Sequence, residues 1–163
     1  MNKFQPHVYV LPEDDANRQL ANGFLLHPDL ATRNIQVLPE AGGWREVLRS
    51  FGSDYASGME RYHQRFMVLL LDFDGDVDRL THAQACIPSE LLPRVFIIGT
   101  LTQPEALRSQ LGSSYESIGL ALARDCFENT DATWGHGLLR HNDTELKRLR
   151  QEVFPCLFSK SSF

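Results

Sequence analysis

The sequence has few of the features that mark several large classes of protein. Its 163 residues include only three cysteines, Cys86, Cys126 and Cys156, which are far apart and odd in number. No disulfide framework follows from them, so a reducing compartment, the cytoplasm, is expected. The longest apolar run, 66–71, is far shorter than the ~20 residues of a membrane-spanning helix. The apolar run near the N-terminus is also too short for a signal peptide. We therefore expect a soluble, cytoplasmic protein with no membrane partner.

Positive charge is scarce as well. The formal net charge is −5, and Lys3, Lys147 and Lys160 are the only lysines. Domains that bind nucleic acid through bulk charge are usually basic, so the composition disfavours that class. An enzyme that acts on nucleic acid through a bound metal and a few arginines remains open. The sequence also lacks a G-x-x-x-x-G-K-[ST] loop, so it carries no phosphate-binding loop of that type.

What is present is typical of one globular domain. Hydrophobic residues make up 42% of the chain and charged residues 23%, with no internal repeat or linker. Four short apolar runs predict strands at 7–11, 34–38, 66–71 and 94–98. The stretches between and after them predict helices at 15–25, 44–51, 55–62, 104–111, 117–127 and 143–153. Pro155 is expected to end the last helix, and the tail 159–163 is expected to fray.

The alternation of strands and helices predicts an α/β fold. We expect a three-layer, Rossmann-like domain over 1–163, with a central, mostly parallel four-stranded sheet. Its core should span about 7–100, and extra helices should form a C-terminal extension over about 101–158. In such sheets, binding sites form beyond the carboxyl ends of the strands.

Two of these strand ends are unusually acidic. Glu13 and Asp14 follow the first strand, whereas Asp72, Asp74 and Asp76 follow the third. Like charges at one edge of a sheet repel one another unless a cation compensates them, and Mg²⁺ takes oxygen ligands of this kind. The alternative is that these acids cap helices or lie in solvated loops, which is the ordinary role of a single aspartate in such a position.

The acidic strand ends resemble those of the Toprim domain, which topoisomerases, primases and OLD-type nucleases share. The resemblance lies in Glu13 within VYVLPEDD, and in Asp72 and Asp74 within LLLDFDGD. The stretch between Glu13 and Asp72 leaves room for the β-α-β-α-β segment of that domain. The match covers 8–100 and is closest to small OLD-type proteins. It departs from the family at Asp14, where glycine usually follows the glutamate.

The resemblance implies metal-dependent phosphodiester chemistry on nucleic acid, most simply a DNA nuclease. Glu13 would act as general acid/base or metal ligand, and Asp72 and Asp74 would hold Mg²⁺ or Mn²⁺. Asp76 is a further candidate ligand. OLD-type relatives also imply an ATPase partner protein.

Two other functions remain open. One is a non-catalytic Toprim-like module that binds a partner or nucleotide. The other is a phosphatase similar to the haloacid dehalogenases, because LLLDFDGD also resembles their first motif. In that case Asp72 would be the nucleophile and Asp74 the acid/base, with Thr100 after the next strand as the second motif. Members of that family usually have threonine or valine at the position of Asp76. They also need a later lysine and a later pair of acids, which are not evident in this sequence.

Four more residues are candidates for contacts to a substrate phosphate. Arg18 lies one turn into the first predicted helix, and Arg79 follows the second acidic cluster. Gly42 and Gly43 precede a predicted helix and would expose backbone amides to an anion. The arginines could equally pair with the neighbouring acids, and the glycines could simply form a turn.

Overall fold

The four apolar runs pair into one parallel sheet in the computed structural model of the chain, which describes residues 1–158. The strands are β1 (His7–Pro12), β2 (Ile35–Val37), β3 (Arg65–Leu70) and β4 (Val95–Ile98). They lie in the order β2-β1-β3-β4, and every neighbouring pair is parallel. The predicted four-stranded sheet is therefore confirmed and is parallel throughout. The prediction for the tail 159–163 lies outside the described residues.

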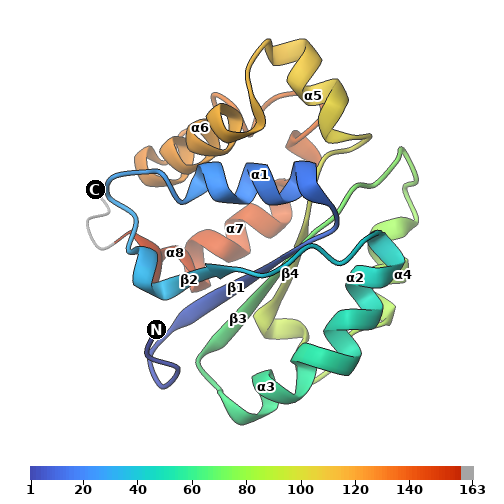
Figure 1. Cartoon of the computed structure of the whole chain (residues 1–163), viewed down its shortest axis with the longest axis vertical. Coiled ribbons are helices and arrows are strands. Elements are labelled where there is room, and N and C mark those ends of the chain that lie inside the picture. Colours follow the sequence, from blue (N-terminus) through green and yellow to red (C-terminus); the bar gives the residue numbers. More distant parts are fainter. Residues whose placement is uncertain (159–163) are drawn as a thin grey trace.

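Helices cover both faces of this sheet, which gives the expected three-layer, Rossmann-like α/β fold (Figure 1). One face carries α1 (Asp15–Phe24), α6 (Tyr115–Glu128), α7 (Asp143–Glu152) and α8 (Phe154–Leu157). The other face carries α2 (Trp44–Ser50), α3 (Ala56–Arg61) and α4 (Arg79–Ala85). The helix α5 (Pro104–Leu111) contacts α6 and α1. Over residues 1–158, none of the helices has the length and apolar character that a membrane crossing requires.

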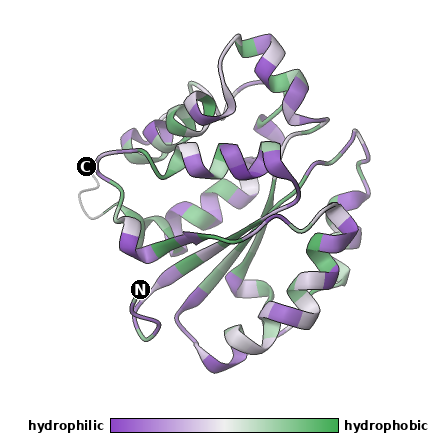
Figure 2. Ribbon diagram, in the orientation of Figure 1, coloured by the Kyte–Doolittle hydropathy of each residue, from purple (hydrophilic) through white to green (hydrophobic). Residues whose placement is uncertain are grey.

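The side chains of each strand alternate between two hydrophobic cores. Val8 and Val10 of β1 belong to the core under α1, whereas Tyr9 and Leu11 belong to the core under α2 and α3. Successive residues of a strand point to opposite faces, so a sheet covered on both sides needs continuous apolar runs. Figure 2 shows this pattern, because β3 and β4 are mostly green while the outer helices alternate between green and purple.

Two details of the helices differ from the prediction. The two helices predicted at 44–51 and 55–62 are present as α2 and α3, but the π-helical turn η2 (Phe51–Tyr55), which was not predicted, joins them. Pro155 does not stop the last helix; α7 ends at Glu152, and Pro155 lies in the first turn of α8. Proline fits there because the first turn of a helix needs no hydrogen bond from that N–H. The remaining connections include the 3₁₀ turns η1 (Thr32–Asn34), η3 (Leu92–Arg94) and η4 (Arg140–Asn142).

The strands that follow β1 in the sequence are added on opposite sides of it: β2 on one side, β3 and β4 on the other. The chain runs from β1 to the edge strand β2, then crosses to β3 and β4 on the other side. The carboxyl ends of β1 and β3 are therefore neighbours, with Pro12 paired to Leu70. Ligands of open α/β sheets bind outside such a switch point. The segments that follow β1 and β3 are thus the first place to look for a site.

Two glycines allow α1 to cross α6 at close range. A Cβ atom on Gly23 would fall within 3.0 Å of the Glu116 backbone, and one on Gly119 would fall equally close to the Leu20 carbonyl. Real Cβ atoms essentially never come so close to backbone atoms. The crossing fixes α1, which begins directly after β1, against α6.

Replacing Gly119 with alanine is expected to lower the free energy of unfolding by about 1–3 kcal/mol, the usual cost of overpacking. The matched control is Gly52→Ala, since a Cβ atom there meets nothing within 4 Å. The control should change stability little or raise it slightly. Chemical denaturation of the two variants measures the difference, and equal stabilities would show that the helices are not in close contact.

Candidate functional site

Glu13 connects the ends of β1 and β3. Its N–H donates to the Leu70 carbonyl (2.8 Å), which continues the strand pairing by one residue. Its carboxylate Oε2 accepts the backbone N–H of Asp72 at 2.6 Å. Its carbonyl accepts the N–H groups of Gly42 (2.8 Å) and Gly43 (3.2 Å). The side chain is 8% exposed, so the glutamate is fixed in the crevice by backbone on both sides.

Asp72 lies opposite Glu13 and is also buried. Its Oδ1 accepts a hydrogen bond from Nδ2 of Asn17 at 2.9 Å. The same Nδ2 donates to Oδ1 of Asp14, also at 2.9 Å, and Asp14 caps α1 by accepting the Asn17 N–H. The Asn17 side-chain amide thus connects Asp14, which caps α1, to Asp72, which follows β3.

Three carboxylates converge at this point. One oxygen from each of Glu13, Asp14 and Asp72 lies within 4.8 Å of the other two. None of the ion pairs found among residues 1–158 involves any of these three groups. The cluster therefore concentrates negative charge that no neighbouring side chain neutralises by direct pairing.

The surroundings oppose ionisation of two of these acids. Burial raises the pKa of Asp72 to about 7, and the nearby charges of Glu13, Asp14 and Asp74 add to the shift, while the Asn17 hydrogen bond opposes it. Burial also raises the pKa of Glu13, partly offset by the hydrogen bond from the Asp72 N–H. Without a cation, the site thus retains a proton near neutral pH.

The donor set fits a hard divalent cation. All three converging groups offer carboxylate oxygens, which Mg²⁺ and Mn²⁺ prefer. Asn17 is fully buried, and its Oδ1 has no hydrogen-bond partner among the described residues. A buried carbonyl oxygen without a partner is costly. The amide nitrogen, not this oxygen, contacts the carboxylates of Asp14 and Asp72.

Asp74 is engaged elsewhere. Its carboxylate pairs with Nη1 of Arg79 at 2.7 Å and accepts a longer hydrogen bond from Gln103 (3.3 Å). Its backbone has φ of +50°, a left-handed conformation that turns the chain sharply after β3. Asp74 is thus close enough to raise the pKa of Asp72 and Glu13, yet it is not among the three carboxylates that converge.

Arg79 stabilises the conformation of the loop after β3, which contains Asp72 and Asp74. Its Nη1 also donates to the Asp72 carbonyl at 2.7 Å, and its guanidinium lies 4.3 Å from the centre of the Trp44 ring. The side chain is buried, so it is a structural cation behind the cluster. Asp76 is exposed and accepts the N–H of Asp78 within the same loop.

The other candidate phosphate contacts are already occupied. Arg18 is exposed and pairs with Asp15 and with Glu40, the latter at 3.1 Å. Gly42 and Gly43 direct their N–H groups at the Glu13 carbonyl. In this arrangement the glycines position the glutamate and present no free amides to an anion.

Sequence reasoning missed Asn17, and it counted Asp14 among the acids at the first strand end without naming it as a metal ligand. Asp14 and Asn17 are three residues apart at the start of a predicted helix. Side chains with this spacing lie close together, so the pattern could have indicated that Asn17 contacts Asp14.

The sequence matches no protein-family model. Neither a search of curated proteins nor a search of solved structures returns a match.

Proposed function

We propose that this protein is a Toprim-like, metal-dependent phosphodiesterase, a nuclease whose site lies at the carboxyl ends of β1 and β3. The observation that carries the proposal is the convergence of Glu13, Asp14 and Asp72 without a pairing cation. The resemblance of VYVLPEDD and LLLDFDGD to the acidic motifs of Toprim domains supports the same assignment.

In this proposal Glu13, Asp14 and Asp72 hold Mg²⁺ or Mn²⁺. A bound divalent ion supplies an activated water and neutralises phosphate charge. Asn17 keeps Asp14 and Asp72 in register by donating to both. Glu13, whose pKa is raised by burial, can hold or release a proton beside the reacting phosphate.

Arg79 and Asp74 have a positioning role in this proposal. Arg79 binds the carbonyl of Asp72 and the carboxylate of Asp74, so it fixes the loop on which Asp72 stands. Trp44 covers the guanidinium from the α2 side. Asp74 serves here to orient the loop, although the Toprim resemblance would make it a ligand.

The substrate we propose is DNA, and the proposed compartment is the cytoplasm, where the free cysteines Cys86, Cys126 and Cys156 stay reduced. The net charge of −5 leaves few contacts for a phosphate backbone. DNA binding should therefore be weak and sensitive to salt. An ATPase partner, as in the OLD-type group, would supply the additional contacts.

The test compares phosphodiesters with phosphomonoesters. The purified protein is incubated at low salt with Mn²⁺ or with EDTA, using single-stranded DNA, duplex DNA and bis(p-nitrophenyl) phosphate as diesters. The matched monoester is p-nitrophenyl phosphate. Diester hydrolysis that requires the metal supports the proposal. Turnover of the monoester alone would favour the phosphatase alternative, in which Asp72 and Thr100 act together, and would end the nuclease assignment.

A further inference from the structure

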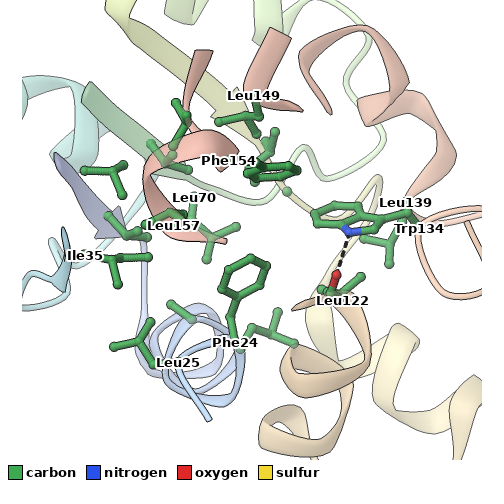
Figure 3. A pocket seen from close by; sticks show the side chains of 18 of the residues that line it. Phe24, Leu25, Ile35, Leu70, Leu122, Trp134, Leu139, Leu149, Phe154 and Leu157 are labelled. Atoms are coloured by element: carbon green, nitrogen blue, oxygen red, sulfur yellow. Dashed lines mark hydrogen bonds between the residues drawn. The ribbon is translucent and has the colours of Figure 1, made fainter. Parts of the chain in front are cut away.

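Tyr115, at the start of α6, has a buried ring and a free hydroxyl group. The residue is 6% exposed, and its ring belongs to the hydrophobic core under α1. Figure 3 shows another part of the same core, where Leu122 and Trp134 line an apolar pocket. The Tyr115 hydroxyl makes no hydrogen bond with any of residues 1–158, and it is not one of the buried polar atoms that lack a partner there. Its oxygen therefore lies at the surface, where a molecule from solvent can reach it.

The Tyr115 hydroxyl lies near the acidic cluster. Burial raises the pKa of this hydroxyl, and the negative charge of Glu105 adds to the shift, whereas the positive charge of Arg108 opposes it. Asp14 and Asp72 raise the pKa further, so two of the three converging carboxylates are close enough to act on the phenol. A phenol that stays protonated is available as a hydrogen-bond donor at neutral pH.

Arg108, on α5, stacks on the ring of Tyr115. The centre of its guanidinium lies 4.8 Å from the centre of the ring. The side chain is exposed and takes part in none of the ion pairs found among residues 1–158. Arg18 and Arg79, in contrast, both pair with acids. The stacking thus holds an unpaired cation beside an unpaired hydroxyl.

The fold places α5 next to the loop that follows β3. Gln103, directly before α5, donates to Asp74 of that loop at 3.3 Å. The helix also contacts α6 and α1, and it lies on the same side of the sheet as both (Figure 1). A hollow in the surface lies between the loop and the first turn of α5, lined by Asp74, Thr102, Gln103 and Ala106. A polymer bound at the cluster and extending over this hollow would lie beside α5, which carries Arg108.

The two side chains suit a phosphate group. A guanidinium can donate two parallel hydrogen bonds to phosphate oxygens, and a neutral phenol can donate one more. The acidic cluster repels an anion unless a divalent cation neutralises it, so an anionic substrate needs further donors close by. The four phosphate contacts considered from the sequence do not supply them, because Arg18, Arg79, Gly42 and Gly43 are engaged within the protein.

We propose that Arg108 and Tyr115 bind a phosphate group of a nucleic acid strand, next to the phosphate that lies at the metal site. This inference rests on the proposed function, because it requires a strand that passes over the acidic cluster. The substrate class is then an oligonucleotide with at least one phosphate beyond the scissile one. Isolated phosphodiesters cannot use the contact.

The test measures binding separately from hydrolysis. The probe is a short, fluorescein-labelled oligothymidylate, and its fluorescence anisotropy is recorded with the full chain in Ca²⁺, which also takes oxygen ligands. Tyr115→Phe keeps the ring and should weaken binding about tenfold, the ratio expected for one hydrogen bond to a charged group. Arg108→Gln should weaken binding to a similar or greater extent at low salt. It should also lower the slope of log Kd against log salt concentration by about 0.7, the value for one phosphate contact on a single strand. Tyr115→Phe should leave that slope unchanged, because no charge is lost.

The matched control is Arg33→Gln, which makes the same change in net charge. Arg33 is exposed in η1, directly before β2, and so lies at the opposite edge of the sheet from the cluster. This variant should bind the probe with the wild-type slope. Failure of the wild type to bind, or equal losses in the two arginine variants, would overturn the proposal. Hydrolysis of the same probe in Mn²⁺ is measured separately. The expected binding pattern without hydrolysis would support the phosphate contact and count against the nuclease assignment.

Discussion

Replacing Asp72 with asparagine is expected to reduce metal-dependent cleavage by a factor of about 10³ or more. Asparagine keeps the shape of the side chain and can still accept the hydrogen bond from Asn17. It removes only the negative charge at the centre of the cluster. Groups that stabilise charge in a buried site contribute two to three orders of magnitude each, and a lost metal ligand removes water activation as well. Initial rates at saturating Mn²⁺ measure the loss.

Glu13→Gln should have a similar effect, because glutamine can still accept the Asp72 N–H while the charge is lost. The control is Asp54→Asn, an exposed acid in the turn between α2 and α3, which should retain full activity. Asp76→Asn should also remain active, because this exposed acid is not one of the three converging carboxylates. Activity that survives in both Asp72→Asn and Glu13→Gln would show that hydrolysis takes place elsewhere.

The same Asp72→Asn variant is expected to be more stable than wild type when no metal is present. The folded protein holds the Asp72 proton up to about pH 7, whereas the ordinary pKa is 3.8. The native state therefore binds more protons than the unfolded state between these values, and the stability of wild type falls as the pH rises through this window. Above pH 7 Asp72 is ionised in both the folded and the unfolded state, so the free energy of unfolding of wild type stays lowered by the full amount.

Asparagine has no such titration, so the difference in unfolding free energy between variant and wild type should grow with pH. It should be near zero at pH 4 and of the order of 4 kcal/mol at pH 8, by the linkage of about 1.4 kcal/mol per pKa unit. Urea denaturation in EDTA at several pH values measures this difference. A constant difference across the range would show that Asp72 has an ordinary pKa and that the cluster stores no electrostatic strain.

Mn²⁺ should reduce this difference in stability between wild type and Asp72→Asn. A ligand that binds only the folded protein stabilises it by about 2.7 kcal/mol at one hundred times its dissociation constant. Wild type and Asp54→Asn should therefore gain in melting temperature with Mn²⁺, while Asp72→Asn should gain little. An equal gain in all three proteins would place the ion outside the cluster.

The sequence predicts that the acids after β1 and β3 lie at the same edge of the sheet, because this placement follows from the parallel direction of the strands. Parallel strands bring their carboxyl ends to one edge, so residues that follow two apolar runs, such as Glu13 and Asp72, were expected to meet. The close hydrogen bond between them adds a detail that spacing alone does not provide.

Other parts of the site depend on contacts between distant elements. Asp74 faces Arg79 because α4 begins directly behind the loop and Trp44 of α2 packs on the guanidinium. Nothing in the Asp-x-Asp pattern distinguishes that pairing from metal binding.

The most direct test of the metal site is a crystal structure of the protein soaked in Mn²⁺, with anomalous scattering measured at the manganese edge. We predict one strong anomalous peak bonded to carboxylate oxygens of Glu13, Asp14 and Asp72. A peak bound only by the exposed acids Asp76 and Asp78, or no peak at the carboxyl ends of β1 and β3, would contradict it.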